Sequence, residues 1–252
     1  MFASARFRQG VKAAIPIWIA FVPSSVAWGI AAQAHGLRLD EIILMSAWVY
    51  SGPAQFAVLE PLSAGKSALQ VLVAGFLMNL RFLPMSAALA PYFRGVQRAK
   101  RAVSCHVVSA SSFIISYLHF QKEREALAEG ITRHPEPDGD ANLYFFLGVG
   151  VTSFLVWVVG TGVGYGVALG MPHGFDEALK FILPGYFAGL LVVEMRGWAM
   201  PVICLGSLLA AIPGALIDPG WGWLTTAVIV ATAGWGLEQW MLRGSRSSSS
   251  WA

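Results

Sequence analysis

The sequence predicts an all-α protein, a polytopic membrane helix bundle with two inverted repeats, each containing a broken or re-entrant segment. Of its 252 residues, 56% are hydrophobic and 12% are charged, and this charged share is about half that of an ordinary soluble domain. The uncharged runs 13–37 and 141–175 are longer than the roughly 20 apolar residues that a helix needs to cross the hydrocarbon layer. This composition excludes a cytosolic enzyme, a secreted disulfide scaffold and a disordered chain.

Eight apolar segments follow one another along the chain. Their approximate bounds are 11–34, 42–62, 68–91, 102–120, 143–169, 179–193, 198–217 and 221–242. A polar connector with nine charges, residues 121–141, separates the fourth segment from the fifth. We therefore expect a first membrane repeat over 1–120, a second repeat over 142–242, and a Ser-rich disordered tail over 243–252.

The second segment contains the run Ser51-Gly52-Pro53-Ala54-Gln55, which predicts a break in its helix. Glycine frees the backbone, and proline removes an N–H donor. If all eight segments crossed the membrane, the basic N-terminus and the basic loop Arg94–Arg101 would lie on opposite sides, against the tendency of cations to remain cytoplasmic. A re-entrant second segment instead leaves both in the cytoplasm and places the connector 121–141 outside.

The sixth segment carries a similar break signal at Leu183-Pro184-Gly185. A weak internal repeat supports the parallel, because His35-Gly36, followed by Asp40-Glu41, resembles the run from His173 to Glu177. Inverted repeats with broken helices at matching positions are typical of secondary transporters, whose binding site they form. The alternative is a chance match between short motifs.

Catalytic and metal-binding motifs are missing from the sequence. The run Ser63-Ala64-Gly65-Lys66-Ser67 resembles the end of a phosphate-binding loop, but Glu60 stands where that loop needs a glycine. The chain has neither a His-Glu-x-x-His pair nor a Gly-x-Ser-x-Gly elbow. We therefore expect no enzyme, cofactor or metal, which leaves a carrier, a channel for a small solute, or a structural subunit of a membrane complex.

Arg81 is the strongest single signal, because it lies near the middle of the otherwise uncharged third segment. A charge at the bilayer centre costs at least about 2.5–3.5 kcal/mol, so such a residue normally has a function and faces the bundle interior. One interpretation is a site for a substrate carboxylate or for gating, with Asn79 two residues before it. The other is a structural ion pair, with Glu60 as the nearest acid in the sequence.

The break at Gly52–Gln55 is the second signal. Lipid cannot satisfy the free N–H and C=O groups of a broken helix, so they must face protein or a water-filled cavity. Helix N-termini favour anions and C-termini favour cations, and an amino acid zwitterion needs both. Neighbouring helices could instead heal a simple proline kink. A third pattern, glycine at every second position from Gly160 to Gly166, predicts close helix packing, with a pore lining as the alternative.

These motifs together resemble the AzlC family of branched-chain amino acid permeases (LIV-E type exporters). The resemblance rests on Ser51 to Phe56, on Asn79-Leu80-Arg81, and on the later pattern Trp157, Thr161, Gly164. It implies an inner-membrane exporter of leucine, isoleucine and valine, with a small membrane partner of the AzlD type. The candidate substrate-binding residues are Ser51, Gly52, Pro53, Gln55, Phe56, Asn79 and Arg81, with Glu60 as a possible ion pair or coupling group.

The resemblance also bears on the apolar part of the site and on the groups that bind charge. The apolar side chain of the substrate would lie against aromatic residues such as Trp48, Phe56 and Phe82. Where the family carries Thr-Asp-Glu near the start of the fourth segment, this chain has Ser109-Ala110-Ser111. Two acids that would bind a proton or the substrate ammonium are therefore replaced.

Overall fold

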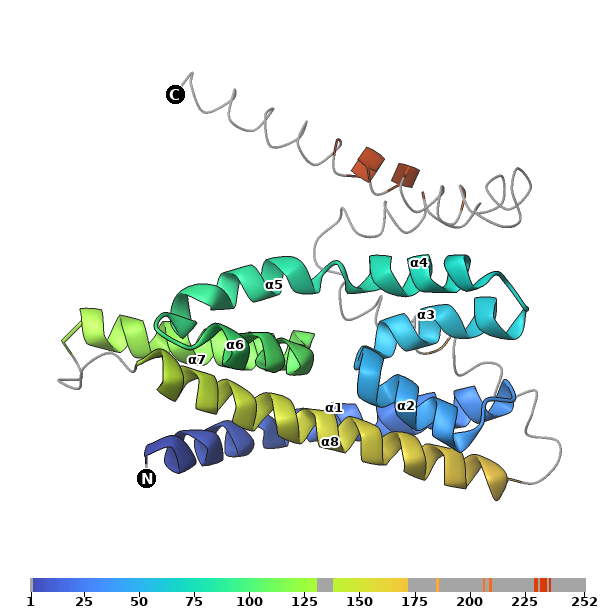
Figure 1. Ribbon diagram of the computed structural model, residues 1–252, viewed down its shortest axis with the longest axis horizontal. Helices are drawn as coiled ribbons and strands as arrows, with labels where there is room; N and C mark the ends of the chain where they lie inside the picture. Colours follow the sequence, from blue (N-terminus) through green and yellow to red (C-terminus); the bar gives the residue numbers. More distant parts are fainter. Residues whose placement is uncertain are drawn as a thin grey trace.

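The computed structural model describes residues 2–130 and 138–171, together with a few isolated positions further along the chain. Every regular element in these two ranges is a helix (Figure 1), which confirms the predicted all-helical class. In chain order the elements are α1 (Phe2–Ala34), α2 (Leu39–Val49), α3 (Gly52–Ser63), α4 (Ala68–Asn79), α5 (Phe82–Leu89), η1 (Ala90–Phe93), α6 (Arg98–Ser104), η2 (Cys105–Val107), α7 (Ala110–Ala128) and α8 (Gly139–Leu169).

Two helical segments are long and apolar enough to cross a membrane. They are 68–93, which comprises α4, α5 and η1, and α8. Helix α1 is a third candidate, although it bends by 58° between Ile19 and Phe21, with Pro16 and Pro23 on either side. Proline removes a backbone hydrogen bond and is a common cause of such a kink.

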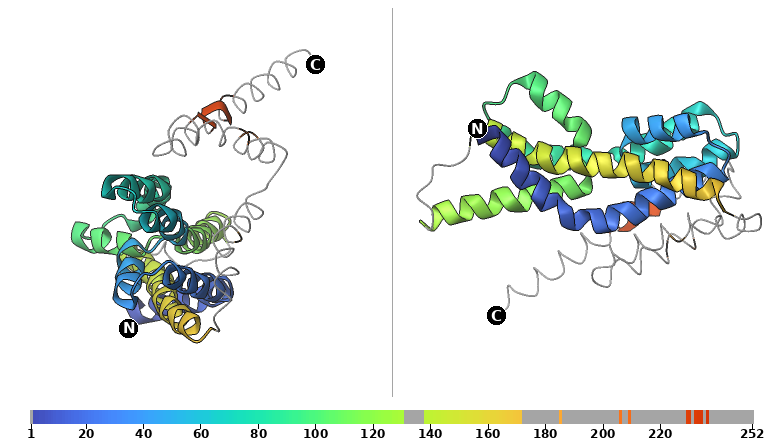
Figure 2. Two further views of the ribbon diagram at one scale, coloured as in Figure 1. Left: turned by 90° about the vertical axis from the view of Figure 1, so that its right-hand side faces the viewer. Right: turned by 90° about the horizontal axis from the view of Figure 1, so that it is seen from below.

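Helices α1 and α8 lie side by side and run in the same direction (Figures 1 and 2). Glycine permits their close approach. A Cβ atom on Gly29 would overlap the carbonyl oxygen of Thr161, and one on Gly164 would overlap that of Val26. The predicted packing role of the glycine run is therefore confirmed for Gly160 and Gly164, which face α1, whereas a Cβ on Gly166 would meet nothing within 4 Å.

The predicted break in the second segment is present, and it turns the chain back. Helix α2 ends before Tyr50, whose φ of 40° is left-handed, and α3 then begins with Gly52 and Pro53. Proline is tolerated there because the N–H groups of a first helical turn have no partner within the helix. At 11 and 12 residues, each arm measures about 17 Å, roughly half of the hydrocarbon thickness. Both arms reach the same end of the bundle (Figure 1).

The fourth segment differs from the continuous span expected over 102–120. Helix α6, η2 and α7 form a second hairpin, with its turn at Val108 and Ser109. Ser109 starts α7 as a cap. Its Oγ accepts a hydrogen bond from the N–H of Ser112 at 3.1 Å, and the Ser112 Oγ accepts one from the N–H of Ser109 at 2.8 Å. Serine at this position satisfies the first donors of a helix, so it favours a new start within an apolar run.

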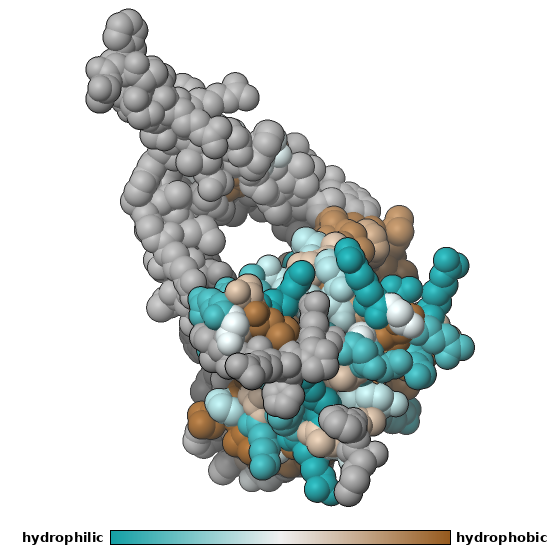
Figure 3. Space-filling view, turned by 90° about the vertical axis from the view of Figure 1, so that its left-hand side faces the viewer, coloured by the Kyte–Doolittle hydropathy of each residue, from teal (hydrophilic) through white to brown (hydrophobic). Residues whose placement is uncertain are grey.

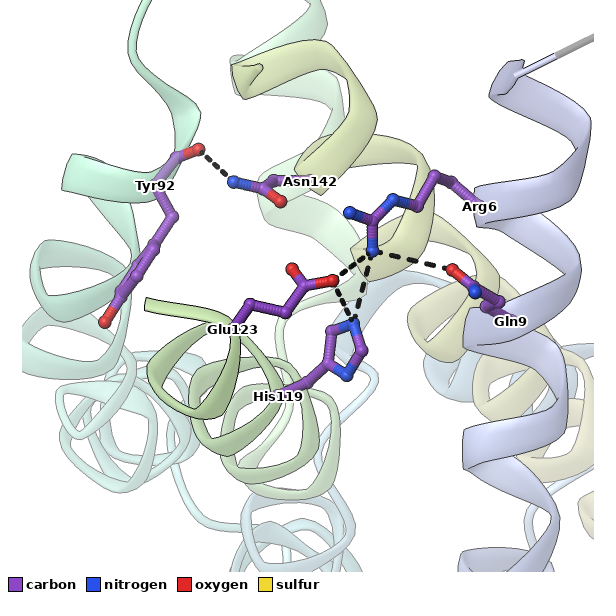
Figure 4. A network of polar contacts seen from close by, with 6 residues as sticks. All are labelled: Arg6, Gln9, Tyr92, His119, Glu123 and Asn142. Carbon is purple, nitrogen blue, oxygen red and sulfur yellow. Dashed lines mark hydrogen bonds and ion pairs between the residues drawn. The ribbon is translucent and has the colours of Figure 1, made fainter. Parts of the chain in front are cut away.

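This second hairpin changes the expected topology. Lys100 in the basic loop pairs with Asp140 of the connector at 3.3 Å, and Arg6 near the N-terminus pairs with Glu123 at 2.7 Å (Figure 4). The connector, the basic loop and the N-terminus therefore share one end of the bundle, whereas we expected the connector on the opposite side. The reason is that α7 returns to the end from which α6 started. Figure 3 views this end, where hydrophilic side chains gather.

Most of the second repeat lies outside the described residues. This includes the expected re-entrant segment 179–193, the sequence match that begins at His173, and the tail 243–252. The inverted repeat and the domain bounds therefore stay predictions. Within the described ranges, the two hairpins enter the bundle from opposite ends (Figure 1).

Candidate functional site

The tips of the two hairpins meet inside the bundle. The Nε2 of His106 donates a hydrogen bond to the backbone carbonyl of Ala47 at 2.8 Å, and the side chains of Tyr50 and Ser109 lie against each other. We call this contact the tip junction, formed by Ala47, Tyr50, Ser51, His106 and Ser109. Ser51 and Ser109 are 4% and 7% exposed, so this part of the junction is buried, whereas Ala47 is half-buried and His106 lies on the exposed side of the junction.

Phe154 of α8 closes one side of the tip junction. Its ring lies edge-on to Tyr50 at 5.1 Å and to His106 at 5.7 Å between centroids. Edge-to-face pairs at such distances are favourable because the positive ring edge meets the negative face. One aromatic ring thus contacts both hairpins.

Helix dipoles converge on the junction. Helix α3 begins at Gly52 and α7 begins at Ala110, so the N-terminal ends of both helices are directed at the tips. Each such end carries about half a positive charge and favours an anion. The C-terminal end of α2, with its carbonyl groups, lies on the same junction at Val49 and favours a cation.

Arg81 reaches this junction from a third direction. It lies where α4 gives way to α5, and its Nη2 is 3.5 Å from the Oγ of Ser51. Its guanidinium carbon also lies 5.2 Å from the centroid of the Phe82 ring. Asn79, also predicted for the site, is half-buried at the end of α4. The side chain of Glu60, the alternative ion-pair partner, lies outside the described residues.

A buried polar core lies behind the tip junction. The amide of Gln55 donates through Nε2 to Ser46 Oγ at 2.9 Å and accepts through Oε1 from Trp157 Nε1 at 2.9 Å. Ser46 Oγ also accepts from Trp28 Nε1 at 3.0 Å and lies 3.1 Å from Thr161 Oγ1. These groups satisfy one another in the interior, where an unpaired polar atom would be costly. The core fixes the first hairpin to α1 and α8.

The predicted site residues thus fall into two groups. Ser51, Gly52, Pro53 and Arg81 lie at the tip junction. Gln55 and Phe56 are fully buried behind it; Phe56 packs edge-on to Trp28 at 5.4 Å. In this conformation those two residues position the hairpin rather than face a space that a solute enters.

Trp48 differs from its expected role beside the substrate. Its side chain is 81% exposed in the described structure, on the outer face of α2. The reason lies in the helical period: Trp48 follows the buried Ser46 by two positions, which places the two side chains on different faces of α2.

The contribution of the second hairpin to the site was not predicted from the sequence. His106 and Ser109 lie in the segment for which the sequence predicts a continuous span, although the four serines between 104 and 112 favour a break. Ser46 and Thr161 were also missed as partners of Gln55. Hydroxyl and amide residues isolated within apolar runs are the signal that could have found them, since such groups must pair with each other.

The polar end contains a separate network (Figure 4). His119 Nε2 lies 3.4 Å from both Arg6 Nη1 and Glu123 Oε1, and its ring stacks on Phe145 with centroids 3.9 Å apart. Burial opposes ionisation of Glu123, but its hydrogen bonds to His119 and Arg6, with their charges, outweigh this and lower its pKa. Among the described residues, no group of three or more His, Cys, Asp or Glu is arranged to hold a metal.

This geometry defines a helical membrane protein in which the tips of two hairpins and a half-buried arginine meet. The model of one family, described as AzlC protein, matches residues 16–170. The chain belongs to the AzlC family. No solved structure matches it.

Three relatives show how widely the sequence pattern is shared. The inner membrane protein YgaZ of Escherichia coli K12 is 24% identical over 197 residues, which cover 77% of this chain and 75% of the relative. An uncharacterized membrane protein of Archaeoglobus fulgidus is 26% identical over 199 residues, 77% of this chain and 78% of the relative. The branched-chain amino acid transport protein AzlC of Bacillus subtilis 168 is 23% identical over 194 residues, 77% of this chain and 68% of the relative.

Proposed function

We propose that this chain is a secondary transporter of the inner membrane that exports branched-chain or other apolar amino acids. The observation that carries the proposal is the contact of Arg81 with Ser51 at the tip of a broken hairpin. The family and the name of the Bacillus subtilis relative support the same substrate class. An apolar pocket discriminates by only about 1–3 kcal/mol per methylene, so the substrate range is broad.

The tip junction offers a partner for each end of a zwitterion. Arg81 and the first turn of α3 suit the carboxylate, since a guanidinium grips a carboxylate with two parallel hydrogen bonds. The carbonyl groups at the end of α2 suit the ammonium. One of them, at Ala47, already accepts a hydrogen bond from His106, so opening the junction frees that acceptor for the substrate.

A carrier fits these contacts better than a channel or a structural subunit. A channel needs a continuous polar lining, whereas Ser46, Gln55 and Thr161 are used in pairing with one another and with two tryptophans. A purely structural subunit does not need an arginine beside the tip of a broken hairpin, because such a charge is costly to keep.

The orientation of the protein in the membrane and its partner subunit are part of the same proposal. The end that carries the N-terminus and Arg94–Arg101 is cytoplasmic, because basic residues concentrate there and the rule for loop charge favours that side. A small membrane subunit of the AzlD type completes the transporter, as expected from the family.

Counterflow of labelled leucine in proteoliposomes tests this function, with and without the small subunit. A carrier gives saturable exchange that depends on unlabelled leucine in the lumen. Flux that rises linearly with concentration would favour the channel, and no flux even with the subunit present would favour the structural role. Arg38→Ala is a matched control, because among the described residues that arginine forms an ion pair only with the neighbouring Asp40, on an exposed surface.

A further inference from the structure

A cavity of about 300 Å³ lies between α5, α6 and α8. Its wall is largely apolar and includes Leu89, Phe93, Val108, Leu143 and Phe146. This volume is at the lower limit for ligand sites, which suits a small solute.

Two arginines are among the residues that line this largely apolar cavity. Arg98 and Arg101 of α6 both line it. Among the described residues neither is recorded in an ion pair, whereas the neighbouring Lys100 pairs with Asp140. Arg98 is exposed and Arg101 is half-buried, so both side chains stand between this apolar space and its surroundings. Such an arrangement suits a carboxylate on a small apolar body, since guanidinium and carboxylate pair in a bidentate fork.

The cavity also ends close to the tip junction. Its lining extends from Arg98, at the start of α6 near the polar end, to Val108, which directly precedes Ser109 of the junction. Cys105 lines the same space and is an exposed free thiol. The chain therefore carries a natural chemical reporter in the cavity wall.

We infer that this cavity is a loading site for the amino acid, in which Arg98 and Arg101 hold the carboxylate before the substrate passes to the tip junction. The inference rests on the proposed function and adds a second binding site to it. Leu89, Phe93 and Phe146 contact the apolar side chain of the bound amino acid.

Protection of Cys105 from a maleimide tests this site. The full chain, with Cys204→Ser to leave one thiol, is placed in nanodiscs and its labelling rate is measured with added leucine, glycine or leucinamide. Leucine slows the labelling. Glycine, which lacks the apolar side chain, and leucinamide, which lacks the carboxylate, leave the rate unchanged.

Variants locate the effect within the cavity. Arg98→Gln and Arg101→Gln each raise the half-protecting leucine concentration about tenfold, the loss expected for one charge-assisted contact. Arg94→Gln is the matched control, because it removes a cation from the same loop but lines a different cavity. Arg81→Ala keeps the protection, because Arg81 does not line this space.

Several outcomes would overturn the loading site. One is a labelling rate that leucine does not change, and another is equal protection by glycine. Protection by anionic lipid alone, with no response to leucine, would assign the cavity to lipid instead. Leucine counterflow by the same protein in proteoliposomes separates the two proposals: counterflow with unprotected Cys105 rejects only the loading site, and protection without counterflow rejects only the transporter.

Discussion

The imidazole of His106 donates a hydrogen bond of 2.8 Å to the backbone carbonyl of Ala47. This bond joins the tips of two hairpins that enter the bundle from opposite ends (Figure 1). Each hairpin is anchored elsewhere, the first through Gln55 to Trp157 and the second through the helix α7 that ends beside Arg6. A movement of either hairpin along its axis must therefore break the bond between His106 and Ala47.

Removing this bond loosens the junction. We expect His106→Ala to leave the protein folded and to expose Ser51, which is 4% exposed in the described structure. The loss of one neutral hydrogen bond costs about 0.5–1.5 kcal/mol, so a cysteine placed at Ser51 becomes more accessible to a thiol reagent, by roughly 2–10-fold. His35→Ala is the control, since the ring of His35 bonds within the described residues only to the carbonyl of Ala31, one turn before it in the chain. Equal labelling in both variants would contradict a role for the bond in closing the junction.

Arg81 is expected to be indispensable for transport. Arg81→Lys keeps the charge but loses the planar fork that grips a carboxylate. We expect it to remain folded and to lose at least about tenfold of leucine counterflow, which corresponds to one charge-assisted contact. Arg81→Ala loses counterflow as well.

A thermal-shift assay on the same samples distinguishes loss of function from loss of fold. Near-normal counterflow by a well-folded Arg81→Ala variant would remove Arg81 from the mechanism. It would move the carboxylate site to the backbone of Gly52–Gln55.

The first break could be predicted from the sequence because Gly52 and Pro53 both act on the backbone itself. The second break at Ser109 was missed, since serine is compatible with an apolar helix and becomes a breaker only when its hydroxyl finds the N–H of Ser112. Arg81 could be predicted as a site residue because a charge within an apolar segment is costly in lipid, and this cost can be read from the local sequence. Its contact with Ser51 depends on how α4 lies against α3, which a single sequence does not fix.

The expected membrane topology also depends on whether the chain turns back at Ser109. Charge counting assumed that the fourth segment crosses the membrane, so it placed the connector opposite to Arg94–Arg101. Once Ser109 turns the chain back, the same rule places both at one end. The ion pair between Lys100 and Asp140 joins residues 40 positions apart, and local sequence patterns do not predict such a contact.

Cysteine labelling in a Cys-free background tests this revised topology. Single cysteines at positions 98 and 130 flank the second hairpin. The ion pairs Lys100–Asp140 and Arg6–Glu123 place both positions at the same end of the bundle. We expect a membrane-impermeant reagent to reach both positions from the cytoplasmic side and neither from outside. Labelling of the two positions from opposite sides would mean that α7 crosses the membrane.

The ion pair between Arg6 and Glu123 makes the stability of the fold depend on pH in the acidic range. Glu123 lies 13 residues beyond the start of α7, about 20 Å from the tip junction, and therefore outside the hydrocarbon layer. Its pKa in the folded state lies below the usual value of 4.5. A group with a lowered folded pKa stabilises the protein above its unfolded pKa, and this contribution is lost as the pH falls through the folded pKa.

We expect thermal stability to fall as the pH drops below about 4.5, and Glu123→Gln to reduce this dependence. At neutral pH the variant loses roughly 1–2 kcal/mol, because a partly buried, charge-assisted bond is lost. Glu125→Gln in the same helix is the control, since it has no ion pair among the described residues. Melting curves of the three proteins between pH 3 and pH 7 check this. An unchanged acid dependence in Glu123→Gln would assign that dependence to other groups.

The packing of α1 on α8 offers a test with a built-in control. Gly164 and Gly166 lie two positions apart in α8, so they share helix propensity and membrane depth. A Cβ on Gly164 would overlap the carbonyl oxygen of Val26, whereas one on Gly166 would meet nothing within 4 Å. We expect Gly164→Ala to force the helices apart and to destabilise the protein by about 1–3 kcal/mol, the usual cost of overpacking.

Gly166→Ala should be neutral or slightly stabilising, because alanine is the better helix former. Thr161 lies one turn before Gly164, so separation of the helices also disturbs its contact with Ser46, 3.1 Å away in the polar core. Gly164→Ala therefore reduces leucine counterflow in parallel with thermal stability, and Gly166→Ala leaves both unchanged. Equal melting temperatures for the two variants would show that α1 and α8 do not approach each other this closely in the membrane.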